Sequence, residues 1–148
     1  MLKKLMVVCA LLLAALASGC ASVPMATPER DSTAKSFAVK PDKANIYVYR
    51  NETMGAAIKM PIVLNGRLVA DTGSKTFLLL EVPPGKHTIV SKTETDSTLM
   101  INAAAGRNYF IWQEVKMGMF AARSALQQVD DATGKAAIAE CKLIETMQ

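Results

Sequence analysis

From residue 44 to residue 129, apolar and polar residues alternate in short runs separated by turn residues, a pattern typical of β-strands. In the first run, 44–50, Ile46, Val48 and Arg50 point to one face and the residues between them point to the other. The turn signals are Asn65-Gly66, which favours a two-residue hairpin, and the Pro-Pro-Gly segment 83–85. The pattern predicts strands at 44–50, 57–64, 67–70, 76–82, 86–92, 97–103, 107–115 and 124–129.

A short helix is expected after the last strand. Asp130 is a suitable N-cap, and alanines recur through 131–140. The segment 44–148 is long enough for two packed layers around one core. We therefore predict an all-β fold, an immunoglobulin-like antiparallel β-sandwich of about seven to nine strands with a short C-terminal helix.

The first twenty residues follow a different pattern. Lys3 and Lys4 precede an apolar run at 5–16, which is too short to span a bilayer core of about 30 Å and is typical of a secretory signal peptide. Residues 17–20, Ala-Ser-Gly-Cys, resemble the bacterial lipobox, whose cysteine thiol accepts diacylglycerol. The resemblance predicts a lipoprotein signal peptide at 1–19, cleavage between Gly19 and Cys20, and lipid on Cys20.

Lipid on Cys20 would decide where the protein resides. Each buried methylene of an acyl chain such as palmitate contributes about 0.8 kcal/mol, so two or more chains give stable attachment to a membrane. Ala21 stands where Asp would resemble an inner-membrane retention signal, so we expect an outer-membrane lipoprotein that faces the periplasm. Two alternatives are an ordinary signal peptide cut near Ala17 or Gly19, and an uncut transmembrane anchor.

Residues 20–43 are expected to form the lipidated cysteine and a flexible tether. The segment is rich in Ser, Thr, Pro and charged residues, and its extended length would reach about 75 Å. Within it, Asp31 is expected to cap a short helical turn over 32–37, which would allow Phe37 to dock on the domain.

Charge excludes one class of partner. The chain has 17 Lys and Arg residues against 13 Asp and Glu, a net charge of +4, which falls to +2 when Lys3 and Lys4 are removed. The basic residues of the mature chain are scattered, whereas nucleic-acid binding needs a cluster of them. Aromatic residues make up only 5% of the chain, so we expect no nucleic-acid partner.

After cleavage, Cys141 has no cysteine to pair with in its own chain, because Cys20 carries the lipid. Its neighbours are mostly apolar, which favours a buried thiol that packs as a small hydrophobe. The alternatives are an intermolecular disulfide or a reactive thiol in an oxidising compartment.

Two sets of residues resemble known families. The segment 65–92 resembles PEGA-type surface modules, with a hairpin glycine, a second glycine before an apolar strand, and Pro-Pro-Gly-x-His. A closer match runs along most of the chain: ANIYVYRNE at 44–52, PPGKHT at 83–88, NYFIWQEVKMGMF at 108–120 and ECKL at 140–143 are similar to the bacterial lipoprotein family of domain of unknown function 2846. The resemblance implies a PEGA-like β-sandwich and no particular activity.

Several carboxylates are candidates for catalytic groups. Asp71-Thr72-Gly73-Ser74 is similar to the aspartic-protease signature, whose paired carboxylates share a proton, but a turn with Gly73 at positive φ is favoured. Glu81, Glu94 and Glu114 include no pair whose spacing indicates glycoside cleavage. A hydrolase that uses Asp71 or a Glu pair is therefore a minor alternative, and we expect no enzyme.

His87 is the only histidine, and no motif gives it a nucleophile or an orienting carboxylate. We expect a partly exposed strand residue on the same face as Ile89 and Ser91. No cysteine pair has the spacing of a metal site. The sequence thus predicts no metal and no cofactor apart from the lipid on Cys20.

The candidate binding surface is formed by Trp112, Tyr109, Met117 and Phe120. Core packing is favoured over a sugar-stacking role for the first two, and core or edge packing over an exposed patch for the last two. The leading hypothesis is a non-enzymatic binding or structural lipoprotein that contacts another envelope protein. The alternative is a peptidoglycan-binding or other glycan-binding module.

Overall fold

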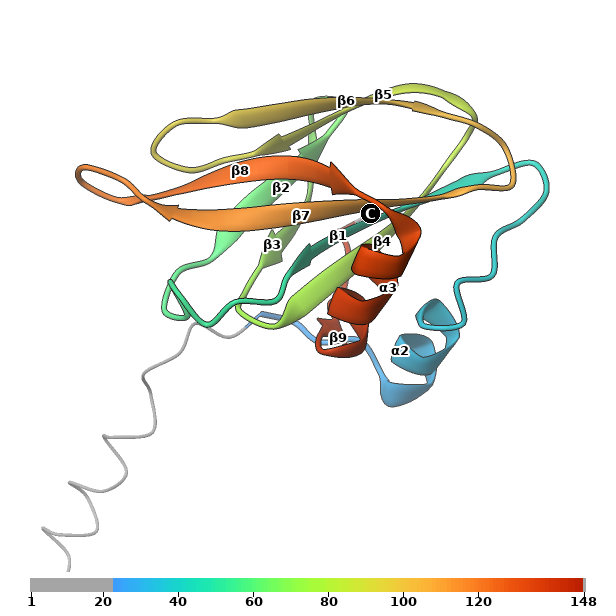
Figure 1. The fold of residues 1–148 in the computed structure, drawn as a ribbon, viewed down its shortest axis with the longest axis horizontal. Coiled ribbons are helices and arrows are strands. Elements are labelled where there is room, and N and C mark those ends of the chain that lie inside the picture. Colours follow the sequence, from blue (N-terminus) through green and yellow to red (C-terminus); the bar gives the residue numbers. More distant parts are fainter. Residues whose placement is uncertain (1–22, 148) are drawn as a thin grey trace, which may run out of the picture.

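The structure is a computed structural model and describes residues 23–147. Within this part of the chain, nine strands form two sheets that face each other, with two helices beside one of them (Figure 1). The five-stranded sheet has the order β8-β7-β1-β4-β9 and the four-stranded sheet β3-β2-β5-β6. The predicted sandwich and C-terminal helix are confirmed. The strands are β1 (Ala44–Arg50), β2 (Met60–Leu64), β3 (Arg67–Thr72), β4 (Thr76–Val82), β5 (Gly85–Ser91), β6 (Ser97–Ala103), β7 (Asn108–Met117), β8 (Ala122–Val129) and β9 (Lys142–Leu143).

The five-stranded sheet is mixed and not wholly antiparallel. β1 pairs antiparallel with β4 but parallel with β7, with Tyr49 opposite Trp112, and β4 pairs parallel with the short β9. Five strands and their connections separate β1 from β7 along the chain, which leaves ample length for a parallel crossover. Alternation along a strand does not indicate the direction of its neighbour, so the sequence pattern missed these two pairings.

The main core lies between the two sheets. Ile46 and Val48 of β1 point inward and meet apolar residues from both sheets, as the alternation predicted. Val23, at the beginning of the described chain, also packs against this core.

A second apolar cluster covers the outer face of the five-stranded sheet. Tyr47 and Tyr49 point to this side, where they meet Phe77, Phe110 and Ile138. Ile138 belongs to α3 (Asp131–Ala139), which lies against the sheet in Figure 1. Because both faces of β1 are covered, all seven of its residues are buried.

The helix α3 begins where the sequence predicted. Asp130 is its N-cap and accepts a hydrogen bond from the Thr133 amide at 2.7 Å. Gly134 faces the sheet so closely that a Cβ on it would lie 2.3 Å from Cγ of Phe110. The glycine, which interrupts the alanine pattern, therefore permits the close approach of helix and strand.

The segment before β1 differs from the flexible tether that we expected over 20–43. From Val23 onward it packs on the domain, and Met25 forms a β-bridge with Ile144. The helix α2 (Pro28–Ala34) has Thr27 and not Asp31 as its N-cap, because Pro28 is well suited to the first helical position. Asp31 instead accepts a hydrogen bond from the Leu143 amide at 2.7 Å.

Phe37 docks on the domain, as predicted. Its ring makes edge contacts with Tyr47 and Phe110, at centroid distances of 5.5 and 5.7 Å. Asn108 Nδ2 donates to the Phe37 carbonyl at 2.8 Å, and Tyr47 Oη donates to the Ala34 carbonyl at 2.9 Å. These contacts bind the N-terminal segment to the outer face of the sheet.

Candidate binding surface at the β7–β8 end of the sandwich

Five large apolar side chains are exposed near one end of the sandwich, and we call this group the apolar tip. Their exposed fractions run from 40% for Ile58 to 90% for Phe120. Core or edge packing was expected for Met117 and Phe120, and the structure overturns that expectation, because the β7–β8 hairpin extends beyond the strands that could cover it (Figure 1). The apolar tip consists of Met54, Ile58, Met117, Met119 and Phe120.

The apolar tip combines two segments that lie far apart in the sequence. Met117, Met119 and Phe120 come from the β7–β8 hairpin, and Met54 and Ile58 come from the β1–β2 loop. A shallow hollow of about 280 Å³ lies between them, with Val115 and Gly55 also in its lining. The hollow is large enough for one or two side chains of a partner and small for an organic ligand.

The buried side chain of Arg50 forms hydrogen bonds to the β1–β2 loop. Its side chain is fully buried, and its Nη1 donates to the carbonyls of Ile58 at 2.9 Å and Thr72 at 3.2 Å. Its Nη2 donates to the Gly55 carbonyl at 3.1 Å. Burial lowers the pKa of the guanidinium, although the nearby Glu52 carboxylate raises it in part. The cation is thus stabilised mainly by carbonyl dipoles of the loop that it organises.

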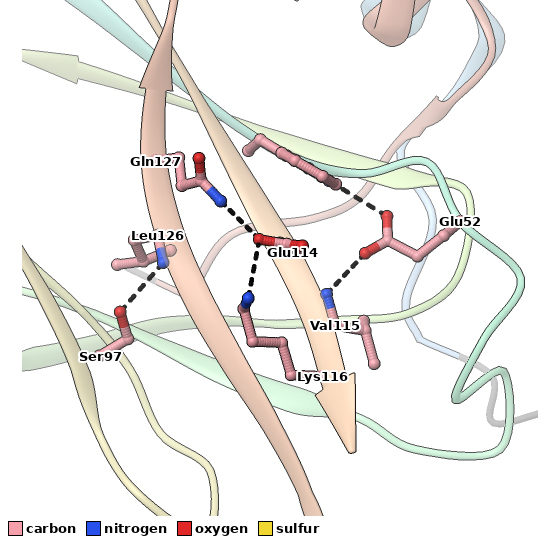
Figure 2. A network of polar contacts seen from close by, with 8 residues as sticks. Glu52, Ser97, Glu114, Val115, Lys116, Leu126 and Gln127 are labelled. Carbon is pink, nitrogen blue, oxygen red and sulfur yellow. Dashed lines mark hydrogen bonds and ion pairs between the residues drawn. The ribbon is translucent and has the colours of Figure 1, made fainter. Parts of the chain in front are cut away.

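Glu52 binds the same loop to the hairpin strand. Its carboxylate accepts hydrogen bonds from the Val115 amide at 2.6 Å and from Trp112 Nε1 at 3.2 Å. Figure 2 shows Glu52 reaching Val115 in β7, with Glu114 on the same strand facing Gln127 of β8 and Lys116. Charge-assisted bonds of this kind are stronger than neutral ones, so the two halves of the apolar tip keep a fixed relative position.

An ion pair lies at the border of the apolar tip. Arg123 Nε lies 3.0 Å from Glu94 Oε2, and the Phe120 amide donates to the same carboxylate. Desolvation raises the pKa of Glu94, but hydrogen bonds from Arg123 and Phe120 lower it overall, so the carboxylate is charged at neutral pH. An apolar centre with an ion-paired border has the composition of a protein-binding surface.

Trp112 and Tyr109 do not join this surface as a row of exposed rings. Both are half-buried, and they face opposite sides of β7: Trp112 packs with the outer cluster and Tyr109 with the core between the sheets. Tyr109 Oη accepts a hydrogen bond from the Ala104 amide at 2.8 Å. Core packing, the favoured expectation for these two residues, is therefore what the structure shows.

The candidate catalytic carboxylates come from different elements: Asp71 from β3, Glu81 from β4, Glu94 from the β5–β6 loop and Glu114 from β7. Asp71 lies in β3 opposite Pro61, and in the following turn the residue with positive φ is Lys75 and not Gly73. Glu81 of β4 and Asn108 of β7 both lie opposite Asn45 of β1. Glu114 follows Asn108 by six residues, so about 20 Å of strand separates the carboxylates of Glu81 and Glu114. This is far beyond the separation that glycoside cleavage requires.

His87 is buried, whereas we expected partial exposure. Its Nε2 donates to the Pro83 carbonyl at 2.7 Å, and its Nδ1 accepts from Asn65 Nδ2 at 2.9 Å. Both ring nitrogens are occupied, so the imidazole joins the hairpin turn to the Pro-Pro-Gly turn. The Ser91 hydroxyl on the same strand bonds instead to Ser124 and Gln113.

Cys141 is buried in the outer cluster, and its Sγ lies 3.5 Å from the Arg50 carbonyl. Burial raises the pKa of the thiol to about 12. A protonated thiol is a poor nucleophile, which agrees with the small hydrophobe that the sequence predicted.

A larger hollow of about 690 Å³ lies between α2 and the outer face of the sheet. The cations in its lining are already paired, Arg30 with Glu145 and Lys40 with Glu81. Among residues 23–147, no three His, Cys, Asp or Glu side chains gather as a metal site. In the same part of the chain, no helix is both long and apolar enough to cross a membrane. Gly19 and Cys20 lie outside the described residues.

Comparison with known proteins places these residues in a family. The model of the family described as "Protein of unknown function (DUF2846)" matches residues 40–125. The chain belongs to this family. A relative from Haemophilus influenzae, titled "Uncharacterized protein", is 35% identical over 133 residues, which is 88% of this chain and 79% of the relative. No solved structure matches. The DUF2846 match extends from just before β1 into β8, so it includes every residue of the apolar tip.

Proposed function

We propose that this DUF2846 protein is a non-enzymatic lipoprotein of the outer membrane, held there by lipid on Cys20, and that it binds another envelope protein through the apolar tip. The observation on which the binding role rests is the exposure of Met117, Met119 and Phe120 beside the β1–β2 loop, which Arg50 binds and Glu52 joins to β7. Membrane attachment rests on the signal peptide and the Ala-Ser-Gly-Cys segment.

A protein partner fits the chemistry of the apolar tip. Three of its five side chains are methionines, which adapt their shape to irregular apolar surfaces. The Glu94–Arg123 pair lies at the border, with the arginine side chain partly exposed to solvent, and favours correct orientation of the partner. A glycan, in contrast, is usually bound by exposed aromatic rings with hydrogen-bonding groups nearby, and Phe120 is the one ring in the apolar tip.

The binding role is tested by photocrosslinking in intact cells. A photoreactive amino acid replaces Met119 in the full-length protein, and the matched control carries it at Met100, a similarly exposed methionine on β6. We expect a discrete crosslinked protein band from position 119 that is absent from position 100. The same weak bands from both positions, or crosslinks to peptidoglycan alone, would contradict a protein partner.

Anchoring is tested separately. Cells grown with labelled palmitate should incorporate the label into the wild-type protein and not into Cys20→Ser, and the mature wild-type chain should begin at Cys20. Label in both proteins, or a mature chain that begins elsewhere, would contradict lipid attachment at Cys20.

A further inference from the structure

The N-terminal segment is bound to one edge of the sandwich from the first described residues. The Glu145 amide donates to the Pro24 carbonyl at 2.9 Å, and the Ala26 amide donates to the Leu143 carbonyl at 3.0 Å. These bonds place the segment beside β9, at the edge strand of the five-stranded sheet. In Figure 1 the blue segment runs next to β9. Val23 is half-buried and packs against the core between the sheets, so the chain already contacts the domain there.

The position of Val23 limits how far the domain can stand from an anchor at Cys20. Only Ala21 and Ser22 lie between them. Three Cα-to-Cα steps of a fully extended chain span about 11 Å. This length is close to the depth of the headgroup layer at a bilayer surface, into which interfacial apolar residues insert by about 5–10 Å.

Exposed apolar side chains belong to the segments that meet near this point of the chain. Met25 and Met147 belong to the two terminal segments, and Leu68 precedes Val69, whose carbonyl accepts from the Met147 amide at 2.7 Å. The three side chains are 42–47% exposed. Arg67, also exposed, is next to Leu68 and has the charge that suits lipid phosphates. We call Met25, Leu68 and Met147 the anchor edge.

We infer that the anchor edge lies in the interfacial layer of the bilayer that holds the lipid of Cys20. The inference rests on the lipid anchoring in the proposed function and adds a second membrane contact, made by the folded domain. The partner of this edge is a lipid surface, because the chain between Cys20 and Val23 spans only about 11 Å. An acyl chain attached at Cys20 therefore brings lipid headgroups to the anchor edge. The apolar tip belongs to a separate set of elements and stays available to a protein partner.

The test measures the depth of reporter groups in the lipidated, full-length protein. A fluorophore is attached to a single new cysteine in Leu68→Cys, in Met147→Cys or in the control Met100→Cys, which lies on the far edge strand of the four-stranded sheet. Cys141 is buried and does not compete for the label. The proteins are reconstituted in phosphatidylcholine vesicles that contain a fraction of lipids with a nitroxide on the acyl chain.

We expect nitroxide quenching at positions 68 and 147 to exceed quenching at position 100 by about threefold, because interfacial residues reach the acyl boundary. Inserting twenty Gly and Ser residues between Ser22 and Val23, a spacer of about 25 Å in root-mean-square length, should lower the quenching at 68 and 147 to the level at 100. Equal quenching at all three positions, or quenching unaffected by the spacer, would overturn the inference.

Palmitate labelling of the same preparations separates this inference from the proposed function. Labelled Cys20 together with equal quenching at 68 and 100 would overturn the membrane contact of the domain and leave lipid anchoring intact. Absence of label from Cys20 would overturn both.

Discussion

Arg50 is a buried cation whose acceptors are three backbone carbonyls. Among the described residues, its Nε has no acceptor, and its remaining nitrogens bond to Gly55, Ile58 and Thr72. The sequence pattern placed Arg50 on the same face of the strand as Ile46 and Val48, and the structure shows that this face points inward. A charged residue on an apolar strand face is a signal for a buried polar role, and Arg50, together with Glu52, organises the β1–β2 loop of the apolar tip.

Replacing Arg50 by Met tests this role. The substitution keeps most of the side-chain volume but leaves three carbonyls without donors. It also removes the cost of burying a guanidinium, which offsets part of this loss. We therefore expect the free energy of unfolding to fall by about 2–4 kcal/mol. Urea unfolding followed by Trp112 fluorescence measures it. The control Arg67→Met, at an exposed position, should change stability by less than about 0.5 kcal/mol. Equal stability of the two variants would contradict the role given to Arg50.

From three buried groups we predict that the folded protein becomes less stable in alkaline solution. Burial raises the pKa of Cys141, Tyr47 and Tyr49 to about 12, from ordinary values of 9.0 for the thiol and 10.0 for the phenols. The unfolded chain releases these protons first as pH rises, so their contribution to stability is complete below pH 9 and is lost between pH 9 and 12. The urea midpoint should therefore be lower at pH 11 than at pH 8.

Tyr47→Phe is the matched variant for this pH dependence. It keeps the ring stacked on Phe110 and removes one titrating group. The variant should lose less stability than the wild type between pH 8 and pH 11, although it is less stable at pH 8 because the hydrogen bond to Ala34 is gone. Identical losses in both proteins would show that Tyr47 does not contribute.

The residues of the apolar tip could be found only in part from the sequence. Met117 and Phe120 were recognised as a possible surface, but nothing in their spacing shows that the hairpin extends past its neighbours. Met54 and Ile58 were missed, because about sixty residues separate them from the hairpin and only the contacts of Arg50 and Glu52 bring them together.

At the scale of elements, the sequence predicted most strands closely. The strands β1, β4 and β6 have the predicted bounds, and α3 begins after Asp130 as expected. These elements depend on local signals, namely alternation, turn glycines and a capping aspartate. The direction in which strands pair, and the existence of the two-residue β9, depend on which distant segment lies beside each strand. A short stretch of sequence does not contain that information.

Gly134 in α3 gives a prediction opposite to the usual rule. Gly→Ala inside a helix normally stabilises by about 1 kcal/mol. Here the new Cβ would lie 2.3 Å from Cγ of Phe110, so we expect a loss of about 1–3 kcal/mol in urea unfolding. The control Ala136→Gly, at an exposed position of the same helix, measures the effect of helix propensity without a change in packing. It should lower the free energy of unfolding by about 1 kcal/mol. A stabilised Gly134→Ala protein would contradict the close packing.

At the scale of the whole molecule, the domain begins about twenty residues earlier than the predicted boundary at 44. The sequence failed here because Ser, Thr, Pro and charged residues are common both in tethers and in short surface elements. The interactions that fix the segment are non-local: Asp31 bonds to Leu143, and Phe37 packs on Tyr47 and Phe110.

A comparison of two starting points tests this boundary. A chain that begins at Val23 should be as stable as one that begins at Cys20 without lipid, whereas a chain that begins at Ala44 loses the cover that Phe37 and Ala34 give to the outer cluster. We expect the shorter chain to be less stable by more than about 3 kcal/mol, the cost of removing one large aromatic side chain from a core. Equal urea midpoints for chains beginning at 23 and 44 would restore the original boundary.

The hydrogen bond between Pro24 and Glu145 shows that the two ends of the folded chain lie side by side. A short peptide could therefore join them, and the polypeptide could be reopened at the exposed Asn65-Gly66 turn to give a circular permutant. In such a molecule the order of the strands along the chain changes while their arrangement in space is kept. The contacts that hold the sandwich together, including those of residues 23–43, would then be kept although the chain begins at a different residue.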